Sequence, residues 1–307
     1  MLTQQLHVQS PKPQHNISMQ RTATSLGADL PNAHAILRMR AMPSHTVNLR
    51  GVSQTMLQTL AIRAFRMSDA LAMSLLRRLN FDFSTAARDE ALSQAVVART
   101  LALDSLTASY IAAYPHGVVV NLAAGLDTRF HRLHTADVTW FNVDLPDVAD
   151  ARARLLGHSK NLFNIAADAT TTAWAEKINN QLAQLRTTTR TATRATAHTA
   201  EAQPDDMPMH QPVLVLMEGL SMYLNDQQMR SILHVAADAF PHAMFVAEAL
   251  TPRAAMTAIM PSISATGSRF TWGADRGDSL HALEPRFQWS ADVPLENREH
   301  YLAILTR

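Results

Sequence analysis

The chain has 307 residues, of which 47% are hydrophobic, so its length and composition suffice for one substantial buried core. Its net charge of +1 gives no electrostatic reason to expect nucleic acid or an anionic membrane as the main partner. The absence of cysteine excludes disulfides, thiolate zinc sites and cysteine nucleophiles.

The N-terminal part of the chain predicts a tail followed by helices. Residues 1–51 form the expected tail, which is polar at its start and lacks the apolar core of a signal peptide. Apolar residues recur at mostly helical spacing over 52–113, which predicts a helical cap region within a single domain of residues 52–307. No apolar run reaches the roughly 18 residues of a membrane-spanning helix, and we expect a cytoplasmic protein.

A buried strand, a tight turn and a helix are predicted within residues 118–130. Three successive valines at the start suit a strand that is covered on both faces, as in a parallel sheet. The small residues at 123–125 then leave room for the backbone to approach a ligand. A second strand ends at Asp144, which lies 144 − 125 = 19 positions after Gly125. This spacing brings a carboxylate next to the turn, a geometry that proteins use to bind the ribose of an adenosine.

Strand and helix patterns alternate along the rest of the chain. Asp168 follows a third strand, Glu218 ends a fourth, and Asp226 is the predicted N-cap of a helix. The expected elements are a helix at 148–156, a strand at 161–166, a helix at 172–185, a strand at 213–218, a helix at 227–239, and strands at 244–248, 287–289 and 301–305. This alternation predicts an α/β fold with a mainly parallel sheet.

Residues 186–211 are expected to form an exposed, mobile insertion. The segment is rich in threonine and arginine and has too little apolar content to pack into a core. Its basic side chains could contact a polyanion, but a solvated loop is the simpler interpretation.

Four motifs, in this order, resemble the leucine carboxyl methyltransferase family. They are ARTLALD at 98–104, NLAAGLDTRF at 121–130, VDLP at 143–146 and EGLSMYL at 218–224. Within the family, the chain is similar to the branch that includes the tetracenomycin polyketide carboxyl methyltransferase, over about residues 52–289. The resemblance implies an S-adenosylmethionine-dependent O-methyltransferase that releases S-adenosylhomocysteine. It also implies a Rossmann-like class I methyltransferase fold, a seven-stranded, mainly parallel sheet with helices on both faces.

The resemblance assigns roles to the residues of a cofactor site. Arg99 would pair with the methionyl carboxylate, for which a planar guanidinium is well suited. Asp144 would accept hydrogen bonds from the ribose hydroxyls, Asp168 would lie near the adenine amine, and Glu218 would complement the methionyl ammonium group. The remaining cofactor-binding residues implied are Ala123, Gly125 and Leu145. Without the resemblance, a surface arginine, an ordinary turn and structural or helix-capping carboxylates would explain the same residues.

Ala123 departs from the family pattern, which usually has glycine at this position. Its methyl group is expected either to crowd the cofactor and weaken binding, or to be accommodated by a small backbone shift. Gly125 is kept, so the cofactor site is still predicted.

Tyr223 and Arg63 are the predicted catalytic residues on the acceptor side. Arg63 would steer an anionic acceptor, or would lie on a solvated helix face. Because a sulfonium methyl is already a strong electrophile, the chain mainly has to hold and align the acceptor. A carboxylate acceptor needs no base, whereas a hydroxyl would profit from one. We expect a small-molecule acceptor such as a polyketide, and neither nucleic acid nor a membrane as partner.

A metal site and two other functions are also considered from the sequence. His131 and His134 lack a carboxylate or third histidine that would complete a metal site, so no metal is predicted. A nicotinamide-dependent oxidoreductase would normally have a fuller G-x-G-x-x-G turn. A non-catalytic relative of the fold, serving as a binding or assembly module, is favoured by Ala123 and by the insertion, and disfavoured by the acidic and basic residues kept in the cofactor motifs.

Overall fold

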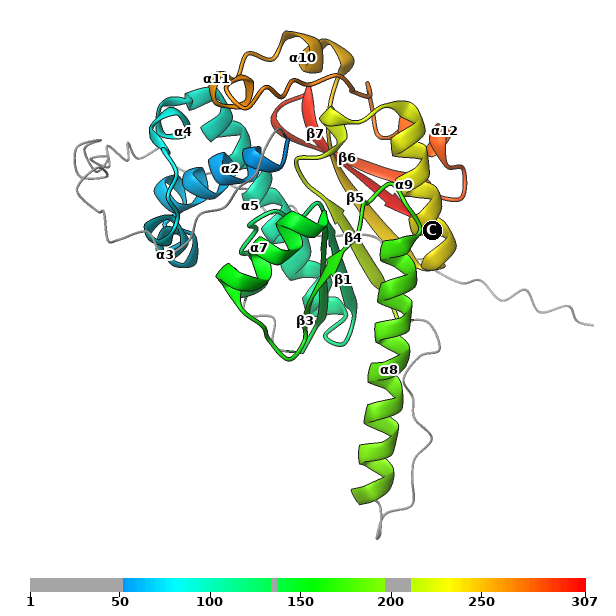
Figure 1. Cartoon of the computed structure of the whole chain (residues 1–307). Coiled ribbons are helices and arrows are strands. Elements are labelled where there is room, and N and C mark those ends of the chain that lie inside the picture. The colour runs from blue at the N-terminus through cyan, green and yellow to red at the C-terminus, as the bar shows by residue number, and fades with distance from the viewer. Residues whose placement is uncertain (1–51, 134–136, 197–210) are drawn as a thin grey trace, which may run out of the picture. The chain divides into compact units, whose positions relative to one another are not determined.

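The computed structural model describes residues 52–133, 137–196 and 211–307, which contain a seven-stranded sheet (Figure 1). The strands are β1 (Val118–Leu122), β2 (Thr139–Asp144), β3 (Leu162–Ala166), β4 (Val213–Met217), β5 (Ala243–Leu250), β6 (Gln288–Asn297) and β7 (His300–Thr306). Their order in the sheet is β3-β2-β1-β4-β5-β7-β6. Strands β1 to β5 pair in parallel, and β7 runs antiparallel to both of its neighbours. The predicted α/β fold with a mainly parallel, seven-stranded sheet is confirmed.

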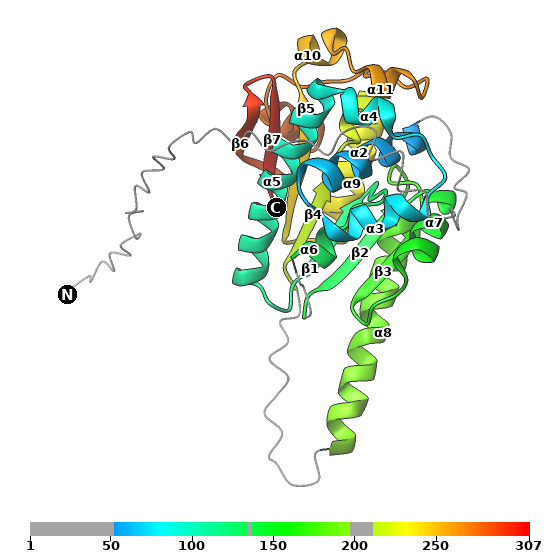
Figure 2. The ribbon, with the colours of Figure 1, turned by 90° about the vertical axis from the view of Figure 1, so that its left-hand side faces the viewer.

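Helices cover both faces of the sheet, which explains why β1 and β4 are buried along their whole length and are apolar except for Asn121 in β1. One face packs against α8 (Ala173–Thr196), α9 (Asp226–Ala239) and α12 (Asp278–Leu283). The other face packs against α5 (Glu90–Ala113) and the short α6 (Arg129–Arg132). Successive residues of a strand point to opposite faces, so Val118 belongs to the first of these clusters and Val119 to the second. Figure 2 shows α5 and α8 on different sides of the strands.

The first three described helices form a cluster of their own. They are α2 (Val52–Arg66), α3 (Ala70–Arg78) and α4 (Ser84–Arg88), and they pack with α7 (Pro146–Leu156). The helical pattern is broken between α2 and α3, where Ser68 has a φ of +54°. Asp69 then caps α3 by accepting a hydrogen bond from the N–H of Ala72 at 2.9 Å. These helices bring Met56 and Arg63 to the turn after β1, where both line a cavity.

Two local predictions are wrong. The helix predicted at 172–185 continues as α8 to Thr196, into the expected mobile insertion. Thr187 and Thr188 donate hydrogen bonds to the carbonyls of Ala183 and Gln184, so polar side chains are accommodated in an exposed helix. Residues 197–210 of that insertion, and the predicted tail at 1–51, lie outside the described residues.

The N-cap of α9 is Asn225, whereas Asp226 is the first residue of the helix. Asn225 and Gln228 form a capping box, because each side chain bonds the backbone N–H of the other residue. The carboxylate of Asp226 instead accepts a hydrogen bond from Trp272 Nε1 at 2.7 Å. Two polar residues in succession allowed either one to be the cap, and the reciprocal pair with Gln228 decides in favour of Asn225.

A segment between β5 and β6 contains two short helices, α10 (Pro252–Thr257) and α11 (Pro261–Ser264). The loop after β4 forms a single 3-10 turn, η1 (Ser221–Tyr223). The α10–α11 segment and η1 line the same cavity as α2. Every helix in the described part of the chain is too short or too polar to span a membrane.

Candidate active site

The main cavity lies where the strand order of the sheet reverses. Strand β1 has β2 on one side and β4 on the other, and Leu122 at its end is in register with Val143 and Met217. In open α/β sheets, ligands bind at such a switch point, outside the carboxyl ends of the strands. The loops after β1, β2, β3 and β4 here line a cavity of about 500 Å³, together with α2, α5 and the α10–α11 segment.

The turn after β1 contains two residues with left-handed backbone conformations, Ala123 at φ +50° and Gly125 at φ +49°. Glycine adopts this conformation freely, whereas for alanine it costs roughly 1–2 kcal/mol. A Cβ atom on Gly125 would also lie only 2.9 Å from Cβ of Met56. Glycine is therefore required at 125 by both conformation and space, and Ala123 is the strained position of the turn.

Asp144 holds this turn. Its Oδ2 accepts a hydrogen bond from the N–H of Gly125 at 2.7 Å, and its Oδ1 accepts one from the N–H of Leu145 at 2.8 Å. Burial raises the pKa of Asp144, against the effect of these two hydrogen bonds, which lower it. Each carboxylate oxygen keeps a further lone pair, so the group can also accept hydrogen bonds from a ligand in the cavity.

Leu145 and Asp168 line the cavity with side chains that the rest of the chain leaves exposed. Leu145 is 42% exposed although it is a large apolar residue. Asp168 is exposed, and its Oδ1 accepts hydrogen bonds from the N–H and the hydroxyl of Thr170, both at 2.8 Å. An exposed apolar side chain and a carboxylate in the lining of one cavity offer a ligand ring one surface to pack on and one acceptor.

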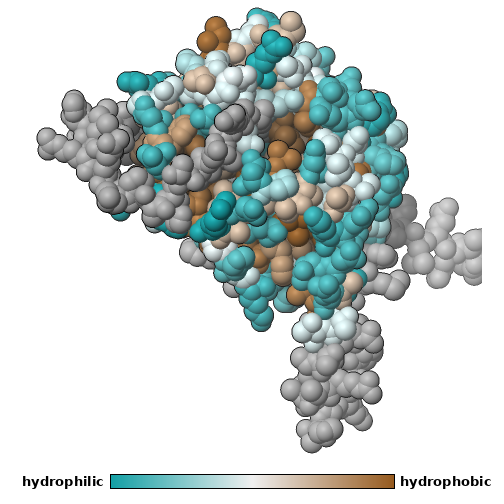
Figure 3. Space-filling model, viewed as in Figure 1, coloured by the Kyte–Doolittle hydropathy of each residue, from teal (hydrophilic) through white to brown (hydrophobic). Residues whose placement is uncertain are grey.

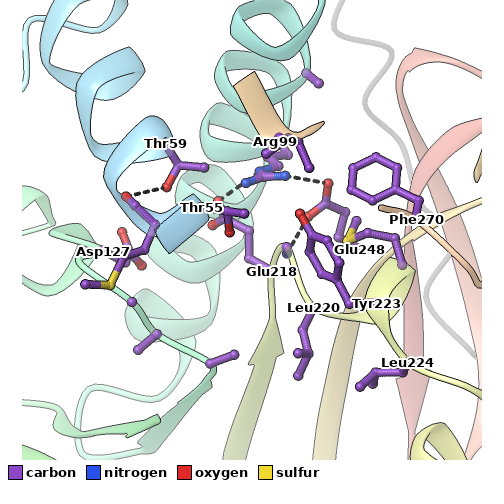
Figure 4. A pocket seen from close by; sticks show the side chains of 18 of the residues that line it. Thr55, Thr59, Arg99, Asp127, Glu218, Leu220, Tyr223, Leu224, Glu248 and Phe270 are labelled. Carbon is purple, nitrogen blue, oxygen red and sulfur yellow. Dashed lines mark hydrogen bonds and ion pairs between the residues drawn. The ribbon is translucent and has the colours of Figure 1, made fainter. Parts of the chain in front are cut away.

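Arg99 joins two buried carboxylates in another wall of the cavity (Figure 4). Its Nε donates to Glu218 Oε1 at 3.0 Å, and its Nη1 donates to Glu248 Oε1 at 3.0 Å. Arg129, which is fully buried, donates from Nη2 to the other oxygen of Glu218 at 2.7 Å. Both oxygens of Glu218 therefore have arginine partners within the chain, and a cationic ligand group would share this carboxylate with them.

The arginines keep both carboxylates ionised. Burial opposes ionisation of Glu218, but Arg129 and Arg99 outweigh it and hold its pKa below the ordinary value. Burial likewise opposes ionisation of Glu248, but Arg99 and His300 lower its pKa to about 2. The Nε2 atom of His300 lies 2.7 Å from Glu248 Oε1. This wall therefore carries fixed, compensated charges at neutral pH.

Arg63 and Tyr223 both line the cavity, and neither lies on a solvated surface. Arg63 is only 3% exposed, and its Nη1 is 3.7 Å from Glu218 Oε1. Its Nε is buried without a hydrogen-bond partner among the residues that the structure describes, and burial lowers its pKa. The ring of Tyr223 packs edge-on against Phe270, with centroids 5.2 Å apart, and burial raises the pKa of Tyr223 to about 12.

Three charged residues of the site are missing from the sequence-based set: Asp127, Arg129 and Glu248. Arg129 Nη1 donates to Asp127 Oδ2 at 2.8 Å, which ties the turn after β1 to Glu218. Asp127 and Arg129 lie inside the 121–130 motif, and Glu248 closes the predicted fifth strand. The adjacency of β4 and β5 would have pointed to Glu248, but strand order cannot be read from these local patterns.

The two histidines considered for a metal site, His131 and His134, do not form one within the described residues. His131 packs edge-on against Phe130, and burial lowers its pKa, while His134 lies outside the described residues. Within the described ranges, no group of three or more histidine, aspartate and glutamate side chains could hold a metal ion.

Comparison with known proteins agrees with this geometry. The family model for leucine carboxyl methyltransferases matches residues 39–237. The tetracenomycin polyketide synthesis O-methyltransferase TcmP of Streptomyces glaucescens is 32% identical over 261 residues, which cover 80% of this chain and 85% of that protein. A crystal structure of a candidate methyltransferase from Thermobifida fusca shares the fold, with a TM-score of 0.51 and 14% identity over 84% of this chain and 94% of that one.

The family match covers well over half of the chain and the match to TcmP covers four-fifths of it, so the resemblance stated from the motifs is confirmed. The expected class I methyltransferase fold, the methyl donor S-adenosylmethionine and the enzymatic class are confirmed with it. The oxidoreductase and the non-catalytic module are accordingly set aside. The chain belongs to the leucine carboxyl methyltransferase family and is an S-adenosylmethionine-dependent methyltransferase.

Proposed function

We propose that the chain transfers the methyl group of S-adenosylmethionine to a carboxylate or hydroxyl oxygen of a small-molecule acceptor, a polyketide or another secondary metabolite. The observation that carries this proposal is the division of the cavity between ionised residues and apolar or aromatic ones. The apolar part includes Leu92, Leu250, Met260, Ile263 and Phe270. Similarity to TcmP, a polyketide synthesis O-methyltransferase, supports the polyketide class.

The residues of the switch point fit the cofactor. Asp144 has free lone pairs for the ribose hydroxyls, Leu145 presents apolar surface for the adenine ring, and Asp168 would accept from the adenine amine. The small turn residues Ala123 and Gly125 would lie against the cofactor backbone. Each of these groups lines the cavity.

Arg99 and Glu218 are proposed to hold the methionyl end. Arg99 uses Nε and Nη1 for the two glutamates, and its Nη2 has no hydrogen-bond partner in the described parts of the chain. This donor is available to the methionyl carboxylate. Glu218 would then share its charge between the arginines and the methionyl ammonium group.

The acceptor side favours an acceptor that is already ionised. The bound cofactor supplies an electrophilic methyl group, and the chain has to align the acceptor oxygen and exclude water. With its pKa near 12, Tyr223 stays protonated at neutral pH and donates a hydrogen bond instead of acting as a base. Arg63 contributes positive charge. A carboxylate needs no base, so it is the acceptor that these two residues suit best.

A hydroxyl acceptor would need a proton acceptor in the wall, and we propose His300, held by Glu248, for this role. His300→Ala separates the two possibilities. Transfer to a carboxylate should persist in this variant, whereas transfer to a hydroxyl should fall by about 10²- to 10⁴-fold, the usual contribution of a general base. Methyl transfer from labelled S-adenosylmethionine to paired aromatic acids and phenols measures both.

Calorimetric titration with S-adenosylmethionine tests the cofactor site. The variants are Asp144→Ala, which removes the carboxylate, and Asp144→Asn, which keeps its shape and one acceptor. Loss of hydrogen bonds to a charged acceptor should weaken binding by roughly 1.5–3 kcal/mol, about ten- to a hundredfold. Failure of the folded wild-type protein to bind the cofactor would contradict the proposal.

The cytoplasmic location expected from the sequence stays a prediction.

A further inference from the structure

A second, smaller cavity adjoins the main one at the α10–α11 segment. Its volume is about 170 Å³. Four residues line both cavities: Ala258, Met260, Ile263 and Phe270. A cavity of about 150 Å³ is enough to hold a benzene ring. The second cavity is thus large enough for one aromatic ring, next to the main cavity.

The segment that forms this second cavity is anchored at two points, one within it and one just after it. Ser262, which is fully buried, donates from its N–H to Asp89 Oδ2 at 2.9 Å and also from its hydroxyl. Asp89 is itself the N-cap of α5. Just after the segment, the N–H of Thr271 donates to the carbonyl of Met222 at 2.8 Å. The walls of the second cavity are therefore held by the cap helices and by η1, independently of any ligand.

The side chains around the second cavity are apolar, apart from two serines and one cation. Met256, which lines it, is 83% exposed, and Ile259, between two lining residues, is 82% exposed. Figure 3 shows apolar surface gathered in a recess of the face it presents. Arg269 also lines the second cavity, is exposed, and makes no ion pair or hydrogen bond with any residue that the structure describes. By contrast, the arginines of the main cavity, Arg63 and Arg99, are buried against carboxylates.

We infer that this second cavity is a distal acceptor subsite, which binds the far ring of an extended, apolar acceptor and whose Arg269 pairs with an acidic group on that ring. The inference rests on the proposed function and makes its substrate class more specific: a molecule of two or more rings, with the oxygen to be methylated at one end and a carboxylate or other ionised group at the other. Burial of the apolar ring provides the binding affinity, and the unpaired guanidinium of Arg269 favours acceptors with a charged distal group over those with a neutral one.

Naphthalene-2,6-dicarboxylate and 2-naphthoate are a matched pair of probes, because they differ only in the distal carboxylate. Each is titrated calorimetrically into protein saturated with S-adenosylhomocysteine. The wild type should bind the dicarboxylate about three- to fivefold more tightly, the range expected for an exposed ion pair. Arg269→Gln should remove this preference and leave 2-naphthoate binding unchanged. Arg154→Gln is the control, since Arg154 is exposed on α7 and lines neither cavity.

Ser264→Trp provides an independent test, because Ser264 is an exposed residue that lines only the second cavity. Filling the cavity should weaken binding of both probes at least tenfold, while Ser264→Ala should not, and both variants should keep their affinity for S-adenosylhomocysteine. Equal binding of the two probes by the wild type, an unchanged preference in Arg269→Gln, or no binding of either probe by cofactor-loaded protein would overturn the inference. If S-adenosylhomocysteine itself fails to bind, the proposed function fails first.

Discussion

The turn after β1 and the arginine–carboxylate wall of the same cavity are built in opposite ways. The turn consists of neighbouring residues, and its backbone is strained at Ala123. It is held by the carboxylate of Asp144 from the adjacent strand and by Arg152 of α7, which donates to the carbonyls of Gly125 and Asp127. The wall joins charges that are remote in the chain: Arg99 lies 119 residues from Glu218 and 149 from Glu248. A local motif shapes the first region, whereas compensation of buried charge holds the second.

This difference predicts where the molecule is sensitive. Removal of one partner from a buried ionic network leaves the others uncompensated, which is costly. Relief of a strained backbone position gains only a little.

Arg129→Ala should destabilise the protein the most. Arg129 is completely buried and pairs with Asp104, Asp127 and Glu218 at 2.7–2.8 Å. Without Arg129, Asp104 and Asp127 keep Arg132 as ion-pair partner and Glu218 keeps Arg99, so each carboxylate loses part of its compensating charge. This loss should lower the free energy of unfolding by about 3–5 kcal/mol. Urea denaturation measures this. The exposed Arg154→Ala should change stability by about 0.5 kcal/mol or less. A loss below about 1 kcal/mol in Arg129→Ala would show that the wall does not depend on charge compensation.

Glu248 should make stability depend on acid pH. Its pKa in the folded state, about 2, lies below the ordinary value of 4.5, so its contribution is complete above pH 4.5 and is lost as pH falls toward 2. The whole contribution amounts to about 3 kcal/mol, of which about 2 kcal/mol is lost by pH 3.

The stability gap between the wild type and Glu248→Gln should therefore narrow by about 2 kcal/mol between pH 7 and pH 3. Urea denaturation at the two pH values gives this gap. Glu176→Gln, at an exposed position of α8, is the control and should show no such change. A gap that stays constant with pH would mean that Glu248 is not held ionised by Arg99 and His300.

Ala123→Gly should stabilise the protein slightly. Glycine removes the cost of the positive φ but loses more entropy on folding, so the net gain should be about 0.5–1 kcal/mol, measured by thermal unfolding. Ser68→Gly, at a φ of +54° between α2 and α3, should give a similar gain without touching the cavity. If Ala123→Gly alone also tightens S-adenosylhomocysteine binding, the alanine methyl crowds the cofactor. If the Ala123→Gly variant is less stable than the wild type, the backbone at Ala123 is not strained as proposed.

The amino-acid sequence was enough to predict the parallel sheet, the tight turn, the position of Asp144 at the end of β2, and the family. These follow from hydrophobic runs, small residues and short spacings, whose consequences stay within one strand–turn–helix unit. The folded chain was needed to show that Arg63 is buried, that Glu218 is shared by several arginines, and that Glu248 and His300 complete the wall. A charged side chain affects stability or ligand binding strongly only when segments that are distant in the sequence bury it together. Local sequence patterns do not show which segments come together.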